Sequence, residues 1–298
     1  MKTNKPRLWV HGLFLGPSIL VFSIGIVAPF LVSCFYSLTD WNGVSRKLTF
    51  IGLQNFVDIF TGKTSFLDAL SFTVTLSVFN IILVVVLGTL VALLVTSKIP
   101  LRNVTKTIFY LPYTIGGMVL GFVWQYVFLE ALPSIGKLLH ISALTIPWLG
   151  YENTAFFALG IVFVWQNLGY VMVIISSGLI SISKEVLESA KIDGAGSITT
   201  FFKIKVPQII PYISTCVFWT TACAFKMFEL SLAMTKGGPY GSTRTLALNI
   251  YYEAFSNNMY GMATAESLIF ILIMSVIVLT QRIVTNRLEK KWGRILVL

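Results

Sequence analysis

Six apolar stretches, each long enough to cross a bilayer, constrain the fold of this chain more than any other feature. A transmembrane helix needs about 20 mostly apolar residues, and every one of these stretches reaches that length. They cover residues 8–38, 69–97, 107–129, 154–180, 211–234 and 262–284. Only 11% of the residues are charged, against about 25% in soluble domains. The sequence therefore predicts an all-α membrane protein with six transmembrane helices.

The basic residues indicate how these helices are oriented. They precede the first apolar stretch, follow the second, occupy the interval between the fourth and fifth, and form the tail at residues 286–298. Short cytoplasmic loops carry an excess of Lys and Arg, so we expect both termini and the interval at 183–211 to be cytoplasmic. Because this charge is dispersed along the ends of apolar stretches, the net charge of +10 does not indicate binding to nucleic acid.

No constellation typical of catalysis or metal binding is found in the sequence. The chain has two histidines and three cysteines, at no metal-ligand spacing, and it contains neither an HExxH nor a GxSxG motif. The triplet Gly62-Lys63-Thr64 matches the end of a phosphate-binding P-loop, but the glycine required five residues earlier is Val57. We therefore expect no catalytic residues, no metal site and no ATPase activity in this chain, which disfavours an intramembrane enzyme.

The interval at 183–211 is the longest charged segment between two apolar stretches. Its pattern predicts two short helices separated by Gly194-Ala195-Gly196, with Ser183 capping the first and Ser197 the second. Pro207 is expected to end the second helix, and Pro211 to lie in the first turn of the next transmembrane helix.

Several residue groups of this interval resemble the EAA loop of bacterial binding-protein-dependent ABC importer permeases. The resemblance is carried by Glu188-Ser189-Ala190, Asp193-Gly194-Ala195, Ile204, Pro207 and Pro211. Ser189 departs from the usual alanine of the motif, a small-for-small change. The resemblance implies a type I ABC importer permease fold in which this loop docks on an ATPase subunit as a coupling helix. The implied coupling residues are Glu188, Ser189, Ala190, Asp193, Gly194, Ala195 and Pro207.

Polar and aromatic residues within the fourth apolar stretch are candidates for the translocation path. Gln166 and Asn167 offer amide hydrogen bonds beside Trp165 and Tyr170, a combination that suits hydroxyl-rich solutes whose C–H faces stack on rings. The alternative is that these residues only form interhelical hydrogen bonds and packing contacts.

Two charged residues, Lys226 and Glu229, lie within the fifth apolar stretch. They are three residues apart, so on one continuous helix they would share a face and could form an ion pair. Charged groups within the membrane usually face the bundle interior or a water-filled path. The pair could therefore line the path or form a gate, or it could only orient its helix. Glu266, near the external end of the sixth stretch, is expected to be an interfacial carboxylate.

Other segments resemble the sugar-permease branch of the same family, including the maltose and glycerol-3-phosphate types. They are 37–41 and 50–56 in the first external segment, 225–229, 235–239 and 242–246. Within the first external segment, the apolar residues of 49–60 also suit a short interfacial helix. We expect residues 1–66 to form an N-terminal transmembrane helix and external segment, 67–285 the transmembrane core, and 286–298 a basic cytoplasmic tail.

The resemblance implies a permease subunit of an ATP-driven carbohydrate importer in the bacterial cytoplasmic membrane. Its implied partners are a second homologous permease, two cytoplasmic ATP-binding subunits that hold ATP and Mg, and an extracytoplasmic solute-binding protein. No cofactor is expected in this chain itself. Two alternatives remain open, namely an ABC permease for another solute, such as a glycerol phosphodiester, an amino acid or a peptide, and a secondary transporter driven by an ion gradient.

Overall fold

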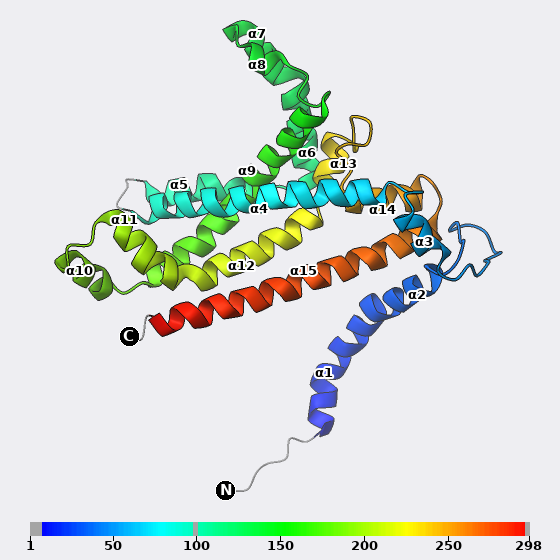
Figure 1. Cartoon of the computed structure of the whole chain (residues 1–298), viewed down its shortest axis with the longest axis horizontal. Coiled ribbons are helices and arrows are strands. Elements are labelled where there is room, and N and C mark those ends of the chain that lie inside the picture. The colour runs from blue at the N-terminus through cyan, green and yellow to red at the C-terminus, as the bar shows by residue number, and fades with distance from the viewer. Residues whose placement is uncertain (1–7, 98–100, 296–298) are drawn as a thin grey trace. The chain divides into compact units, whose positions relative to one another are not determined.

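The computed structural model describes residues 8–97 and 101–295, and most of them are helical (Figure 1). Lys2, Lys5, Arg7 and Lys98, four of the basic residues used to orient the chain, lie outside the described residues. The chain divides into two compact units, which are described separately. The first contains residues up to Ser65 together with Ile250–Ile271, and the second contains Phe66–Asn249 and the residues from Leu272 onward.

The prediction of six transmembrane helices is confirmed. Six helical segments of the described chain are long and apolar enough to cross a membrane: Phe14–Tyr36, Phe66–Thr96, Gly117–Leu139, Glu152–Ser181, Ser197–Phe225 and Tyr260–Leu288.

The first unit begins with α1 (Leu8–Phe22), a π-helical turn (Ser23–Val27) and α2 (Ala28–Tyr36). A loop then leads to α3 (Gln54–Phe60), and a backbone bridge pairs Thr39 with Phe50. α14 (Leu246–Phe255) enters this unit at Ile250, and α15 (Tyr260–Ile295) leaves it after Ile271.

The second unit is built on α4 (Phe66–Thr96) and α9 (Glu152–Ser181), which pack along much of their length. Close approach depends on two glycines, because a Cβ at Gly88 would meet Val171 and one at Gly160 would meet Phe79. α12 (Val206–Phe225) lies against both helices (Figure 1). Small residues at helix crossings are typical of membrane bundles, where close packing takes over part of the role of hydrophobic burial.

Shorter elements complete this unit. α5 (Arg102–Tyr110) and a 3₁₀ turn (Leu111–Thr114) precede α6 (Gly117–Tyr126). A π-helical turn (Val127–Ala131) and α7 (Leu132–Leu139) continue it, and α8 (Ser142–Thr145) leads to α9. α10 (Lys184–Ile192), α11 (Ser197–Thr200) and another π-helical turn (Phe201–Lys205) connect α9 to α12, and α13 (Glu229–Met234) follows α12.

Three π-helical turns each end two residues before a proline, namely Pro29, Pro133 and Pro207. A proline lacks the backbone N–H and its ring crowds the carbonyl four residues earlier, which here is the central residue of each π turn. Widening the helix to a π turn accommodates the ring without ending the helix. The expectation that Pro207 ends the second loop helix is therefore wrong, because helical structure runs from Ser197 to Phe225.

Two expected transmembrane helices are interrupted. The third stretch breaks at Ile115 and Gly116, which have extended backbone between the 3₁₀ turn and α6, and it does not end near Leu129 but continues to Leu139. The fifth stretch does not reach Met234 as one helix, because α12 ends at Phe225 and α13 begins at Glu229. Both breaks lie beside the candidate site.

Candidate functional site

A cavity of about 500 Å3 lies within the second unit, beside the two helix breaks. It combines aromatic, amide and charged side chains. Its lining consists of Tyr113, Gly117, Phe163, Gln166, Asn167, Trp219, Cys223, Lys226, Met227, Phe228, Glu229 and Leu230. The structure thus brings Gln166, Asn167, Lys226 and Glu229 together, four of the six residues that the sequence indicated for the path.

The two amides are held by backbone carbonyls. Gln166 Nε2 donates to the carbonyl oxygen of Ile115 at 3.0 Å, so it satisfies an acceptor at the first helix break. Asn167 Nδ2 donates to the carbonyl of Phe163 on its own helix at 2.8 Å. These bonds fix the orientation of both side chains at the cavity wall. Gln166 therefore both lines the cavity and forms a hydrogen bond between two elements, so the two interpretations of this residue hold together.

An aromatic cluster forms one side of the cavity. Trp219 of α12 stacks on Tyr170 of α9 with ring centroids 4.0 Å apart. Tyr113 packs against both rings, with centroids at 5.6 Å from Trp219 and 5.2 Å from Tyr170. Tyr170 therefore supports the lining ring of Trp219 from behind. Sequence reasoning missed Trp219 and Tyr113, because neither position follows a pattern that separates a lining ring from ordinary membrane packing.

Trp165 lies apart from this cavity. It packs edge-on against Trp124 at 5.4 Å and is 43% exposed. Two residues correspond to about 200° around an α-helix, so Trp165 projects from nearly the opposite side of α9 from Asn167. The structure does not bring Trp165 together with the other candidate path residues.

The expected ion pair between Lys226 and Glu229 is not formed, although both residues are described and both line the cavity. The two residues do not share a helix, because Lys226 follows the last residue of α12 and Glu229 is the first residue of α13. Glu229 Oε2 instead accepts a hydrogen bond from the backbone N–H of Met118 in the first turn of α6, at 3.2 Å. The carbonyl of Met227, within the break, accepts from Thr245 Oγ1 at 2.7 Å.

α6 and α13 are joined at both ends. Glu229 bonds to the start of α6, and Gln125 Nε2, near the end of α6, donates to the carbonyl of Met234 at 3.1 Å. Between these bonds a Cβ at Gly121 would lie 2.5 Å from the Cβ of Ala233. The Gly117–Gly121 pair in the sequence therefore marks a close contact between two short helices that wall the cavity.

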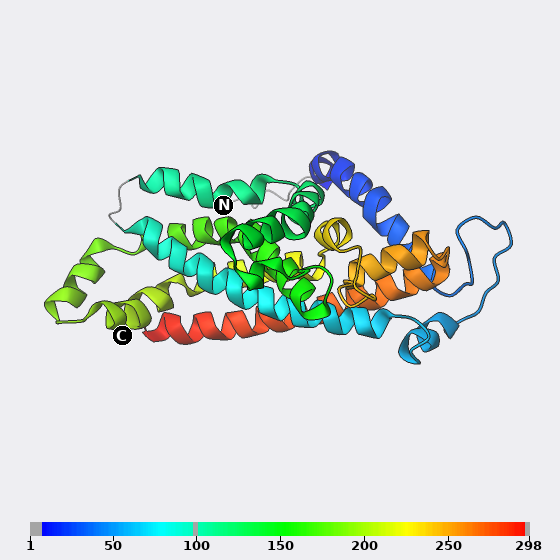
Figure 2. The same cartoon turned by 90° about the horizontal axis from the view of Figure 1, so that it is seen from above.

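The loop at 183–211 forms two helical segments at the end of the unit where α9 ends and α12 begins (Figures 1 and 2). Ser183 Oγ accepts from the N–H of Val186, which caps α10 as the sequence predicts. At the other end, Gly194 has a φ of +76°, and the N–H groups of Gly194 and Ala195 donate to the carbonyls of Lys191 and Ala190. This arrangement is a Schellman motif, in which glycine occupies the left-handed position after the helix.

The other members of the EAA-like group occupy distinct positions on this loop. Glu188, Ser189 and Asp193 are exposed, Ala190 and Pro207 are buried, and Ala195 is half-buried. Ser197 does not cap α11, because Gly196 precedes the helix and Ser197 is its first residue. Ile192, Ile198 and Phe202 expose apolar side chains around these helices.

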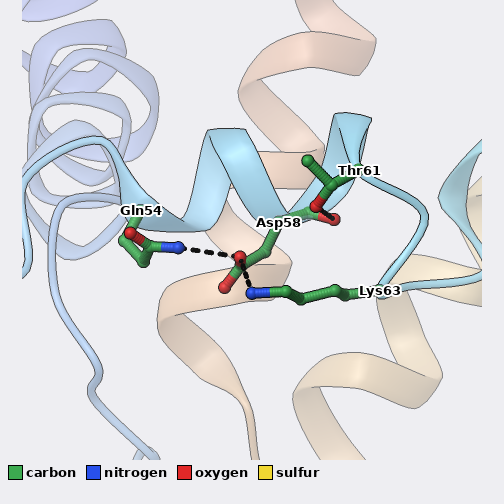
Figure 3. A network of polar contacts seen from close by, with 4 residues as sticks. All are labelled: Gln54, Asp58, Thr61 and Lys63. Carbon is green, nitrogen blue, oxygen red and sulfur yellow. Dashed lines mark hydrogen bonds and ion pairs between the residues drawn. The ribbon is translucent and has the colours of Figure 1, made fainter.

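The triplet Gly62-Lys63-Thr64 has a structural role in the first unit (Figure 3). Lys63 Nζ lies 2.6 Å from Asp58 Oδ1, and Gln54 Nε2 donates to the same oxygen at 2.8 Å. The hydrogen bonds from Lys63 and Gln54 lower the pKa of the Asp58 carboxyl. The lysine of the triplet is therefore engaged by a carboxylate on α3.

Glu266 differs from its expected position. Its side chain is 0% exposed, so it is not an interfacial carboxylate. Ala263 and Ile269, three residues before and after Glu266 on the same face of α15, are also buried, so Glu266 belongs to the buried face of this helix. Among the described residues, no group of three or more His, Cys, Asp or Glu side chains could hold a metal ion.

Comparison with known proteins gives the same assignment as the loop and the fold. Residues 84–290 match the family described as the binding-protein-dependent transport system inner membrane component. The chain is 38% identical over 288 residues, 97% of each protein, to the probable starch degradation products transport system permease protein AmyD of Thermoanaerobacterium thermosulfurigenes. It is 33% identical over 88% of its length, and 90% of the relative, to the multiple sugar-binding transport system permease protein MsmF of Streptococcus mutans.

The fold is also that of solved ABC transporter permeases. One chain of a bacterial alginate ABC transporter, in complex with an alginate pentasaccharide-bound periplasmic protein, superimposes with a TM-score of 0.82. The match covers 95% of this chain and 96% of the other at 21% sequence identity. Family match, relatives and fold agree, and the chain belongs to the family of binding-protein-dependent transport system inner membrane components.

Proposed function

We propose that this chain is the permease subunit of an ATP-driven ABC importer and that its cavity forms part of the path for a carbohydrate. The observation that carries the proposal is the juxtaposition of the stacked Trp219–Tyr170 rings with the amides of Gln166 and Asn167. A sugar presents C–H faces that pack on aromatic rings and hydroxyls that bond to amides. The names of the relatives from Thermoanaerobacterium and Streptococcus support a starch-derived or other sugar substrate.

A second candidate is a phosphorylated solute. The sn-glycerol-3-phosphate permease UgpA of Escherichia coli is 28% identical over 94% of this chain, and Lys226 supplies a cation at the cavity wall. Glu229 lies at the same wall, however, and its carboxylate opposes an anion. The balance of one cation and one carboxylate favours a neutral carbohydrate over a phosphorylated solute such as glycerol 3-phosphate. An amino acid zwitterion would match the same two charges, but the names of the relatives from Thermoanaerobacterium and Streptococcus refer to starch products and sugars, which favours a sugar over an amino acid or a peptide.

The loop at 183–211 would couple ATP binding and hydrolysis to the motion of the permease. We propose that Glu188, Ser189, Ala190, Asp193, Gly194, Ala195 and Pro207 form or position the surface that docks on a cytoplasmic ATPase. Two such subunits would bind ATP and Mg and hydrolyse the nucleotide, while a second permease would complete the path. An extracytoplasmic solute-binding protein would deliver the sugar, and both termini would be cytoplasmic. The exposed apolar residues Ile192 and Ile198 support a protein contact at this loop.

Transport by the complete complex tests the proposed substrate. The complex, reconstituted with its binding protein in proteoliposomes, should take up radiolabelled malto-oligosaccharide when ATP is enclosed, and glycerol 3-phosphate should not compete. Trp219→Ala should reduce uptake, whereas Trp165→Ala is a matched control because that ring lies outside the cavity lining. Competition by glycerol 3-phosphate, or equal losses in the two variants, would contradict a carbohydrate path through this cavity.

A further inference from the structure

The short helix α3 in the first unit has three different faces. Asn55 and Ile59 point inward and are buried. Gln54 and Asp58 form a polar face with Lys63, joined by the hydrogen bonds and ion pair of Figure 3. The third face is apolar but exposed, since Leu53, just before the helix, is 66% exposed, Val57 51% and Phe60 61%. These three residues recur at spacings of four and three, so they form one stripe.

Asn55 ties this helix to the outer end of the first membrane-spanning segment. Its Nδ2 donates to the carbonyl oxygens of Ser37 and Thr39, both at 2.9 Å. These carbonyls directly follow Tyr36, the last residue of α2 and of the apolar span Phe14–Tyr36. The N–H of Ile51 also donates to the carbonyl of Leu38 at 2.9 Å. α3 is therefore fixed at the level where the chain leaves the membrane.

We propose that α3 is a membrane-surface anchor, with Leu53, Val57 and Phe60 embedded in the headgroup region of the outer leaflet. This proposal requires the family's membrane location and the outward orientation of residues 37–65, but it does not depend on the transported solute. A helix with a polar face and an apolar stripe lies in the plane of the interface and buries only the stripe. The anchor would hold the start of α4, which begins six residues after Phe60, at a fixed depth.

Lipid fits this stripe better than a protein partner does. In the same unit, α2 also exposes apolar side chains, namely Leu31, Val32 and Phe35, and Asn55 bonds α3 to the residues that directly follow α2. Those residues belong to a membrane-spanning segment, so their surroundings include acyl chains. On the neighbouring face, Asp58 is engaged by Lys63 and Gln54, so these charges are already matched within the chain. A lipid surface needs no further charge complementarity from α3.

Spin-label accessibility in the complete complex tests the anchor. Cys34, Cys216 and Cys223 are first replaced by alanine, and a nitroxide is attached at Val57→Cys or Phe60→Cys. In nanodiscs without binding protein, both labels should collide readily with oxygen and be shielded from water-soluble nickel-EDDA. A label at Gln54→Cys, on the polar face of the same helix, is the matched control and should show the opposite preference. Sugar uptake by the same preparations reports separately on the proposed function.

Three other outcomes are possible, and each would overturn the proposal. Nickel-EDDA accessibility at Val57 and Phe60 equal to that at Gln54 would place the stripe in water. Shielding from both oxygen and nickel-EDDA would place it against a protein subunit of the complex. Shielding that appears only after the solute-binding protein is added would identify the stripe as a docking surface for that protein.

Discussion

The carboxylate of Glu229 accepts a hydrogen bond from the backbone N–H of Met118, with 3.2 Å between Oε2 and the nitrogen. Met118 is the second residue of α6, so the carboxylate lies at the positive end of that helix and satisfies one of its free N–H groups. The spacing in the sequence predicted an ion pair between Glu229 and Lys226. Glu229 is instead bonded to a helix that lies more than one hundred residues earlier in the chain. Lys226 and Glu229 should act independently of each other.

Replacing Glu229 should destabilise the α6–α13 contact. Loss of a helix-capping acceptor costs about 0.5–2 kcal/mol, so Glu229→Ala should lower the unfolding temperature of the purified complex. Glu229→Gln keeps an acceptor oxygen and should lose less. Lys226→Ala should leave the unfolding temperature near that of the wild type, and the double variant Lys226→Ala/Glu229→Ala should show the sum of the single effects. Rescue of Glu229→Ala by the second substitution would instead require an ion pair between the two residues.

A methyl group at Gly121 should separate α6 from α13. The added Cβ would lie 2.5 Å from the Cβ of Ala233, so one of the two helices must shift. Overpacking of this kind costs about 1–3 kcal/mol, and we expect Gly121→Ala to lower both the thermal stability of the complex and its sugar uptake. Gly116→Ala is a matched control, because no atom lies within 4 Å of the corresponding Cβ. Equal stability of the two variants would show that the two helices are not in close contact.

The proposed topology predicts a pattern of thiol labelling in intact cells. In a background without native cysteines, Tyr240→Cys should react with an impermeant maleimide, because Tyr240 is 100% exposed and is assigned to the extracytoplasmic side. Ser183→Cys and Asn286→Cys are also at exposed positions but should react only after the membrane is permeabilised. Labelling of Ser183→Cys before permeabilisation would reverse the orientation and remove the loop from the ATPase side.

Local patterns predicted the long helices, but they placed several of the helix ends incorrectly. The apolar stretches and the cap at Ser183 depend on nearby residues, which the sequence displays directly. Pro207 was expected to end a helix, and instead a π turn at Phe201–Lys205 accommodates it within a continuous one. Conversely, α12 ends at Phe225 without a nearby proline or glycine, and the break is completed by Thr245, whose hydroxyl bonds to the carbonyl of Met227.

The difference between local patterns and contacts from distant parts of the chain also explains which residues of the candidate site could be predicted. Gln166 and Asn167 could be selected because amides are costly within a membrane. Trp219 and Tyr113 could not, because aromatic residues are common in such helices, and only the packing of α12 and of the 3₁₀ turn at Leu111–Thr114 against α9 brings them together with Tyr170. The prediction of an ion pair between Lys226 and Glu229 assumed an uninterrupted helix. It was wrong because the helix is interrupted between Phe225 and Glu229.

Gly194 provides the most specific test of coupling, and the structure shows why glycine is needed there. No atom lies within 4 Å of a Cβ built at this position, so a larger side chain would not clash within the chain itself. The φ of +76° is the constraint, because a left-handed conformation costs an L-residue about 1–2 kcal/mol and a β-branched residue more. Gly194→Val should therefore unwind the Schellman motif and displace α10 relative to α11.

We expect Gly194→Val to abolish ATP-driven uptake and to reduce co-purification of the ATPase, while the second permease still co-purifies. Gly194→Asn should retain most of the uptake and most of the co-purified ATPase, because asparagine tolerates the left-handed conformation. Gly196→Ala is the matched control two residues away, since Gly196 has an ordinary φ of −67° and equally open surroundings. If Gly194→Val retained the ATPase and transported at the wild-type rate, the backbone turn after α10 would not transmit the motion of the ATPase, and the coupling role of this loop would have to be abandoned.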